Sequence, residues 1–255
     1  ALRAIFGLAT DELVAADQVQ AANDLEKFAE AYQAKHQLTP ESDTKVILVV
    51  GKNDWPFPIP LVKKDGRWYF DTDAGKDEIL SRRIGRNELA TLETVRAYVD
   101  AQREYASRDR NGDEVLQYAQ QFASSPGKKD GLYWSPELDG EISPLGPLVA
   151  EAQDEGYKQK GTDERVPYHG YYFKVLTRQG RHAPGGAYNY IINGNMIGGF
   201  ALVAWPAHYG ESGIMTFIVN QQGRVYQKDL GTKTGKIGPT MPEYNPDPSW
   251  KLSPD

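Results

Sequence analysis

The order of its secondary structure constrains this chain more than any other feature: one long helical stretch precedes a succession of short β-type segments. Residues 77–108 place Leu92, Val95 and Val99 on one stripe at helical spacing, with an interruption expected at Gly85. The segments that follow are rich in β-branched and aromatic residues and are separated by Gly, Asn and Pro: GYYFKVLT, YNYII, FALVAW, GIMTFIV and RVYQKDL. This order is typical of an α+β protein, so we expect the helix to pack on one face of an antiparallel sheet.

The first 75 residues predict a smaller arrangement of helices and strands. The stretch NDLEKFAEAYQAKHQ carries apolar residues at helical spacing, and Asn23 and Glu26 occupy the positions of a capping box. After LTPESD, the segments VILVVG, IPLVKK and GRWYFDTD predict strands, and Asp65-Gly66 between the last two is a favoured hairpin turn. We therefore predict two domains: residues 1–84, with helices and a small antiparallel sheet, and residues 85–255, with the long helix and the larger sheet.

Composition excludes several classes of function. The chain of 255 residues has 35 acidic and 29 basic residues in no long blocks, and its net charge of -6 argues against a nucleic-acid surface. No stretch of the sequence comes close to the about 18 consecutive apolar residues that a membrane-spanning helix needs. The absence of cysteine excludes disulfides, thiolate zinc sites and cysteine nucleophiles. Because the sequence begins with Ala1 and ALRAIFGL is typical of the later part of a helix, we expect that an upstream segment, such as a signal peptide, has been removed.

No complete catalytic motif is present. The four histidines lack the spacing of a zinc-binding helix, and GESG at Gly210 lacks the second glycine of a hydrolase nucleophile elbow. The glycine-rich APGGAYNYIINGNMIGG ends in neither a phosphate loop nor a dinucleotide fingerprint. The remaining candidates are carboxylates at the exit of the first sheet, which could form a glycosidase-type pair or, more commonly, surface ion pairs and a helix N-terminal charge: Asp71, Asp73, Asp77 and Glu78.

Two aromatic segments are candidate binding surfaces. The prolines of DWPFPIP disfavour both a helix and a central strand, so Trp55 and Phe57 form either a binding lip or a cap on the core. His169 and His208 border strand ends rich in aromatic residues. They are either structural histidines bonded to backbone or members of one pocket together with Tyr171, Trp205 and Tyr209.

The stretch YASRDRNGDEVLQYAQQF is a candidate metal loop. Asp109, Asn111 and Asp113 offer three side-chain oxygens on one side of a turn, and calcium prefers six to eight oxygen ligands. Glu114 stands where a calcium-binding EF-hand has glycine, and Gln120 stands where it has a bidentate glutamate, so any such site should be weak. The alternative is a polar turn in which Asp113 caps a helix over EVLQYAQQF. No other cofactor is expected.

Six motifs occur in this order along the chain: DWPFPIPLVKKDGRWYFDT, RRIGRNELATL, AYVDAQREYASRDRNGD, YHGYYFKVLT, GGFALVAWPAHYG and GIMTFIVNQQGRVYQKDLG. Together they resemble the bacterial family catalogued as domain of unknown function 2950, and the resemblance extends from about Ala1 to Trp250. Members of that family typically begin with a secretory signal, so the resemblance implies an exported, periplasmic protein without an established activity. The part from about Glu88 also resembles the soluble domains of type IV pilin-like and pseudopilin proteins, although the long helix lacks their apolar N-terminal half.

The resemblance and the missing catalytic motifs together favour an exported, non-catalytic binding or envelope-assembly module. Its expected partner is an unidentified envelope protein or polymer. The alternative is a hydrolase that acts on an envelope polymer through the carboxylates between Asp71 and Glu78.

Overall fold

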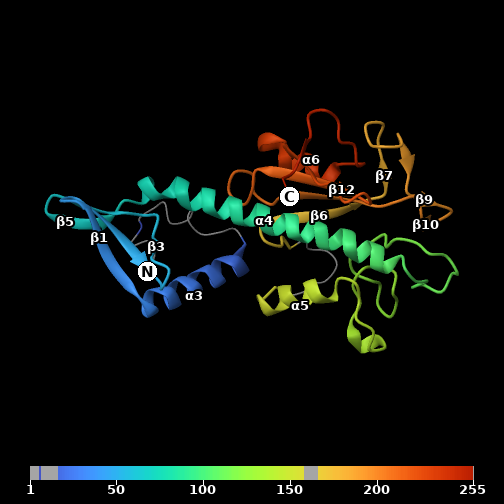
Figure 1. Cartoon of the computed structure of the whole chain (residues 1–255), viewed down its shortest axis with the longest axis horizontal. Helices are drawn as coiled ribbons and strands as arrows, with labels where there is room; N and C mark the ends of the chain where they lie inside the picture. Colours follow the sequence, from blue (N-terminus) through green and yellow to red (C-terminus); the bar gives the residue numbers. More distant parts are fainter. Residues whose placement is uncertain (1–5, 7–16, 158–165, 255) are drawn as a thin grey trace. The chain divides into compact units, whose positions relative to one another are not determined.

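The computed structural model describes residues 6, 17–157 and 166–254, and the chain divides into two compact units (Figure 1). Unit 1 is Ala1–Arg86 with Gly210–Ser212, and unit 2 is Asn87–Tyr209 with Gly213–Asp255. The domain boundary predicted after residue 84 lies close to this division. The helix end expected over residues 1–8 lies, except for Phe6, outside the described residues.

Unit 1 begins with helix α3, Gln18–Ala34. The side chain of Asp17 caps it by accepting hydrogen bonds from the backbone N–H groups of Val19 and Gln20, both at 3.1 Å. The capping box predicted at Asn23 and Glu26 is therefore wrong, because both residues lie inside the helix. Asp17 already satisfies the donors of the first turn, so the helix starts more than a turn earlier than predicted.

The sheet of unit 1 is antiparallel, with the strand order β1-β2-β4-β5 and with β3 paired to β2. The predicted hairpin at Asp65-Gly66 is confirmed: Lys64 pairs with Arg67, and the two turn residues have φ angles of 52° and 77°. Strand β1 was not predicted: all its residues are exposed, so no alternation of buried and exposed side chains marks it. The strands are β1 His36–Ser42, β2 Lys45–Val50, β3 Trp55–Pro56, β4 Leu61–Lys64 and β5 Arg67–Phe70.

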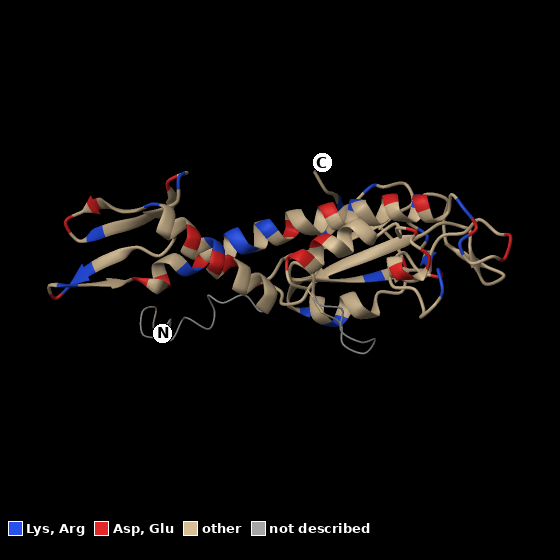
Figure 2. Ribbon diagram, turned by 90° about the horizontal axis from the view of Figure 1, so that it is seen from below, with Lys and Arg blue, Asp and Glu red and all other residues tan. Residues whose placement is uncertain are grey.

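Helix α4, Thr72–Tyr105, contributes its first part to unit 1 and the remainder to unit 2. The interruption predicted at Gly85 is wrong, because the helix is continuous through this residue. A glycine inside a helix costs about 1 kcal/mol relative to alanine, which packing of a long helix readily outweighs. Figure 2 shows that acidic and basic residues are interspersed along the ribbon.

The α+β architecture predicted for the second part is confirmed. Its main sheet is antiparallel, in the order β14-β13-β12-β11-β6. Leu92, Val95 and Val99 of α4 share one buried cluster with Leu202 of β11 and Val219 of β12, so the predicted stripe of α4 does pack on this sheet (Figure 1). The five strands are β6 Tyr171–Leu176, β11 Ala201–Pro206, β12 Met215–Asn220, β13 Tyr226–Asp229 and β14 Lys251–Leu252.

Smaller elements complete unit 2. They are helices α5 Gly146–Asp154 and α6 Thr234–Thr240, the 3-10 turns η2 Pro136–Leu138 and η3 Gly231–Lys233, and short paired strands β7 Arg178–Gln179 with β8 Tyr188–Asn189 and β9 Ile191–Ile192 with β10 Asn195–Met196. Over the described ranges, no helix has the length and apolar character needed to cross a membrane.

The helix predicted over EVLQYAQQF is wrong, because residues 114–122 are irregular. Glu114 has a φ of 65°, which no right-handed helix accommodates. The Gln102 side chain on α4 then accepts from the Ala119 N–H and donates to the Ala119 carbonyl, both at 2.8 Å. These tertiary hydrogen bonds take the backbone groups that a local helix would have used.

Candidate ligand pocket

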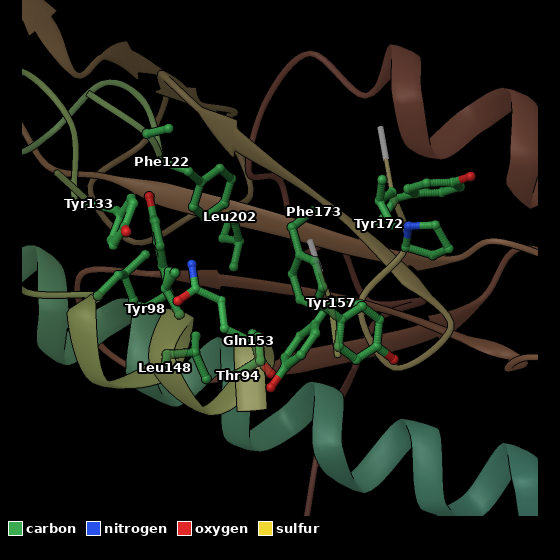
Figure 3. Close-up of a pocket in the computed structure, with 17 residues that line it drawn as sticks. Thr94, Tyr98, Phe122, Tyr133, Leu148, Gln153, Tyr157, Tyr172, Phe173 and Leu202 are labelled. Carbon is green, nitrogen blue, oxygen red and sulfur yellow. The ribbon is translucent and has the colours of Figure 1, made fainter. Parts of the chain in front are cut away.

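Unit 2 contains an apolar pocket of about 360 Å³ (Figure 3). Its walls come from α4, α5, β6, β11 and the irregular segments between them. Among the described residues, seven that line it are aromatic: Tyr98, Phe122, Tyr133, Tyr157, Tyr168, Tyr172 and Phe173.

The spacing of residues along two helices and the sheet determines which side chains face the pocket. Thr94 and Tyr98 are four residues apart on α4, so they lie on the same face of the helix. On α5, Leu148 and Ala152 have the same spacing, and Figure 3 shows Leu148 and Gln153 projecting from this helix. Leu202 of β11 adds an apolar wall from the sheet.

Tyr98 is the fixed polar group of one wall. Its hydroxyl donates to the Ala201 carbonyl at 3.2 Å and accepts from the side-chain amide of Gln102 at 3.0 Å. Burial raises the pKa of Tyr98 well above its usual range, so the phenol stays neutral at physiological pH. The ring is held rigidly against Phe122 and Phe200, at centroid distances of 5.7 Å in both cases.

Another side of the pocket is a cluster of three rings. The Tyr157 ring centroid lies 5.1 Å from that of Tyr168, which lies 4.2 Å from that of His169. The Tyr157 hydroxyl accepts from the His169 backbone N–H at 3.3 Å, and His169 Nε2 lies 3.3 Å from a carboxylate oxygen of Glu155. Burial, followed by the charge of Glu155, raises the pKa of Tyr168, so this phenol is neutral as well.

The pocket is chemically suited to holding an apolar group. Among the described residues, Thr94 and Gln153 are the polar side chains other than tyrosine that line it, and no carboxylate does. The Thr94 hydroxyl donates to the Ala90 carbonyl at 2.9 Å, which leaves its oxygen as an acceptor. The lining offers neither a paired acid and base nor an activated nucleophile.

The structure separates the residues that the sequence grouped with the histidines. His169 adjoins the pocket, beside Tyr157 and Tyr168. Tyr171 is fully buried, and its hydroxyl donates to the Met215 carbonyl at 3.0 Å. His208 and Tyr209 lie outside the lining, and the Tyr209 hydroxyl donates to Asp229 at 3.2 Å.

The exposed aromatic surface predicted at Trp205 is wrong, because this side chain is 2% exposed. Helix α6 covers the face of β11 that carries it. On the same face Lys174 of β6 donates from Nζ to the carbonyls of Pro239 and Met241 in and after α6, both at 2.9 Å. The core therefore extends to both faces of β11, where the sequence predicted an exposed strand end.

Two of the four carboxylates at the start of α4, Asp71 and Glu78, make a helix cap and a surface ion pair. The Asp71 side chain accepts from the Ala74 N–H at 3.3 Å, as a helix cap does. Glu78 pairs with Nε of Arg82 at 2.7 Å, and both side chains are exposed to solvent. Trp55 and Phe57 also lie in unit 1, where they line a separate groove.

The Asp109 loop is hydrogen-bonded within itself. The two carboxylate oxygens of Asp109 accept from the N–H groups of Gly112 and Glu114, both at 2.8 Å. Asp113 accepts from Asn111 Nδ2 at 2.9 Å and from Gln117 Nε2 at 2.8 Å. The backbone hydrogen bonds, that from Glu114 first, hold the pKa of Asp109 below its usual range. The polar turn thus satisfies its own acceptors, and calcium binding stays a prediction.

Sequence reasoning missed most of the pocket lining. Tyr157, Tyr168 and Phe122 belong to irregular segments with no periodicity to show which way they point. The spacing of Thr94 and Tyr98 on α4 and that of Leu148 and Ala152 on α5 were signals that could have indicated inward faces.

Comparison with known proteins fits this picture. The family model described as Protein of unknown function (DUF2950) matches residues 1–252. The chain belongs to this family. The resemblance to it is therefore confirmed, whereas the pilin-like resemblance stays a prediction. No curated protein and no solved structure matched this DUF2950 chain.

Proposed function

We propose that this DUF2950 protein is an exported, non-catalytic binding module whose pocket in unit 2 takes a small, mainly apolar molecule. The observation that carries the proposal is the aromatic lining of a pocket of about 360 Å³ with few polar groups. Small-molecule sites typically enclose about 300–1,000 Å³ and combine apolar walls with a few polar groups that fix orientation. Thr94 and Gln153 provide such groups, so the ligand should carry one hydrogen-bonding function on an aryl or alkyl body.

Export is the second part of the proposal. It rests on the secretory signal that the resemblance implies, and it fits a chain without cysteine. In that compartment the ligand or partner would be a component of the cell envelope. The resemblance of the part from about Glu88 to pilin-like domains favours a role in envelope assembly, with the pocket recognising an apolar group of the partner.

The pocket can be tested with a neutral fluorescent probe, N-phenyl-1-naphthylamine, titrated into the full chain. Ala152→Phe adds a ring to the lining of the pocket, whereas Ala150→Phe adds the same ring at an exposed position of the same helix outside the lining. We expect one probe per chain, with binding weakened about tenfold or more in Ala152→Phe and unchanged in Ala150→Phe, since a tenfold change needs only about 1.4 kcal/mol.

Equal probe binding by the two variants would refute the pocket as the site. Export is tested separately, by releasing the periplasm of cells that make the natural full-length protein by osmotic shock. Recovery of the protein in the cytoplasmic fraction alone would refute that part of the proposal.

A further inference from the structure

Unit 1 holds a second and larger concavity, a groove of about 920 Å³ between α3, residues 50–59 and the first part of α4. Its apolar base includes Phe28, Phe57 and Ile59. The ring centroids of Phe28 and Phe57 are 5.2 Å apart, and Ile59 is fully buried. The groove shares no lining residue with the pocket of unit 2.

The charges that line this groove are mainly positive, in a chain whose net charge is -6. The acidic lining residues are Asp24 and Glu30, and Asp24 is already neutralised by a bidentate ion pair with Arg86, at 2.8 and 2.7 Å. The cationic ones are Lys27, Lys52, Arg82, Arg83 and Arg86. A concave surface with an excess of one charge concentrates ligands of the opposite charge.

Arg82 is fixed at the edge of the groove by three contacts. Its guanidinium lies 5.2 Å from the ring centroid of Trp55, its Nε donates to Glu78 at 2.7 Å, and its Nη1 donates to the Pro56 carbonyl at 3.3 Å. Within the described part of the chain, its second terminal nitrogen has no acceptor. A guanidinium held in this way presents its remaining N–H groups without a large loss of side-chain entropy on binding.

Arg83 brings a second guanidinium deeper into the groove, since only 7% of this residue is exposed. Burial lowers the pKa of Arg83 and the nearby carboxylate of Asp24 opposes this effect, but arginine stays charged in proteins. A positive charge in a partly desolvated groove interacts more strongly with a bound anion than a charge on an open surface does.

We propose that this groove binds a small amphiphilic anion, an alkyl chain that carries one carboxylate. The apolar base between Phe28, Phe57 and Ile59 would hold the chain, and Arg82 and Arg83 would receive the carboxylate through charge-assisted hydrogen bonds. A neutral apolar ligand would desolvate these guanidinium groups without bringing a negative charge to them. An inorganic anion would leave the aromatic base unused.

Calorimetric titration of the full chain with decanoate, below its critical micelle concentration, tests this assignment. Decanol, with the same chain length, controls for the apolar term. Arg82→Gln removes a charge from the groove, and Arg67→Gln removes the same charge from an exposed position of unit 1 outside it. We expect decanoate to bind one site, about tenfold more weakly in Arg82→Gln and unchanged in Arg67→Gln, because only Arg82→Gln removes a charge-assisted hydrogen bond to the carboxylate. Arg82→Lys, which keeps the charge and loses the planar fork, should fall between them.

Four results would overturn the assignment. Decanol binding as tightly as decanoate would show that the charge plays no part, and equal binding by the two glutamine variants would show that the anion lies elsewhere. Binding lost in Ala152→Phe but kept in Arg82→Gln would place decanoate in the pocket of unit 2. Failure of a glutamate-rich peptide to bind is expected; its binding in place of decanoate would also refute the proposal.

Discussion

Replacing Gly238 by alanine should destabilise unit 2, whereas the same replacement at Gly235 should stabilise it. Both glycines lie in α6, in helical conformation. A Cβ atom at Gly238 would lie 2.4 Å from Cγ and 2.6 Å from Cδ2 of the Trp205 indole, while a Cβ atom at Gly235 would meet nothing within 4 Å. Because Trp205 of β11 is buried beneath α6, its ring cannot swing into solvent to make room.

The magnitudes follow from two opposing effects. Alanine in place of glycine inside a helix gains about 0.4–1 kcal/mol, mainly by restricting the unfolded chain. Overpacking a close-packed core costs about 1–3 kcal/mol, and a contact of 2.4 Å with a ring atom belongs at the upper end. We expect Gly238→Ala to lose about 2 kcal/mol and Gly235→Ala to gain up to about 1 kcal/mol.

Urea unfolding followed by tryptophan fluorescence measures both free energies, and thermal melting provides an independent check. For a domain of this size about 1 kcal/mol corresponds to about 2–4 °C, so Tm should fall by about 4–8 °C in Gly238→Ala. A Gly238→Ala protein as stable as Gly235→Ala would refute the close packing of α6 on Trp205.

Three further predictions concern ionisable groups. A calcium site at Asp109 predicts that millimolar calcium raises the Tm of the wild-type protein but not of Asp109→Ala; a Tm indifferent to calcium and to chelator in both leaves only the polar turn. Burial alone would raise the pKa of Asp130, but hydrogen bonds from the backbone N–H and the hydroxyl of Ser125 lower it. The stabilisation by this carboxylate should therefore be present above about pH 4 and be lost as the pH falls through the lowered pKa. The urea midpoints of the wild type and of Asp130→Asn should differ more at about pH 7 than at about pH 3. Burial, followed by the charge of Asp130, raises the pKa of Tyr105 from 10.0 to about 12. The wild type should therefore lose stability relative to Tyr105→Phe as the pH rises over this interval. A constant difference between the urea midpoints of the two proteins across this interval would contradict the shift.

The sequence was sufficient to predict the long helix and the antiparallel sheets, because both produce a regular spacing of apolar residues or a recognisable turn. Leu92, Val95 and Val99 lie on the stripe that packs on the sheet, and Asp65-Gly66 has the positive φ angles that its hairpin requires. It was not sufficient where a distant element decides burial. TGKIGPT, which forms α6, contains two glycines and a proline and gives little helical signal, yet this helix buries Trp205.

The same limit applies to the candidate pocket. Tyr98 and Tyr105 lie on one helix and look alike in sequence, but Tyr98 lines the pocket while the Tyr105 hydroxyl is bonded to the Lys129 carbonyl at 2.7 Å. Which tyrosine borders open space depends on the path of residues 114–133. That path is fixed by tertiary hydrogen bonds such as those from Gln102 to Ala119, and no local pattern encodes them.

The pocket of unit 2 and the groove of unit 1 differ in chemistry, and this difference makes their ligands separable. The pocket is apolar with neutral phenols, so a neutral probe should prefer it, whereas the groove carries an excess of guanidinium and ammonium groups. A ligand at about 100 times its Kd stabilises the folded state that binds it by about 2.7 kcal/mol. Since the two linings belong to different compact units, each ligand should stabilise directly the unit that holds its site. A neutral probe that protects Trp134 and Trp205 of unit 2 from urea, and an anionic probe that instead protects Trp55 and Trp68 of unit 1, would establish two independent binding sites in one chain.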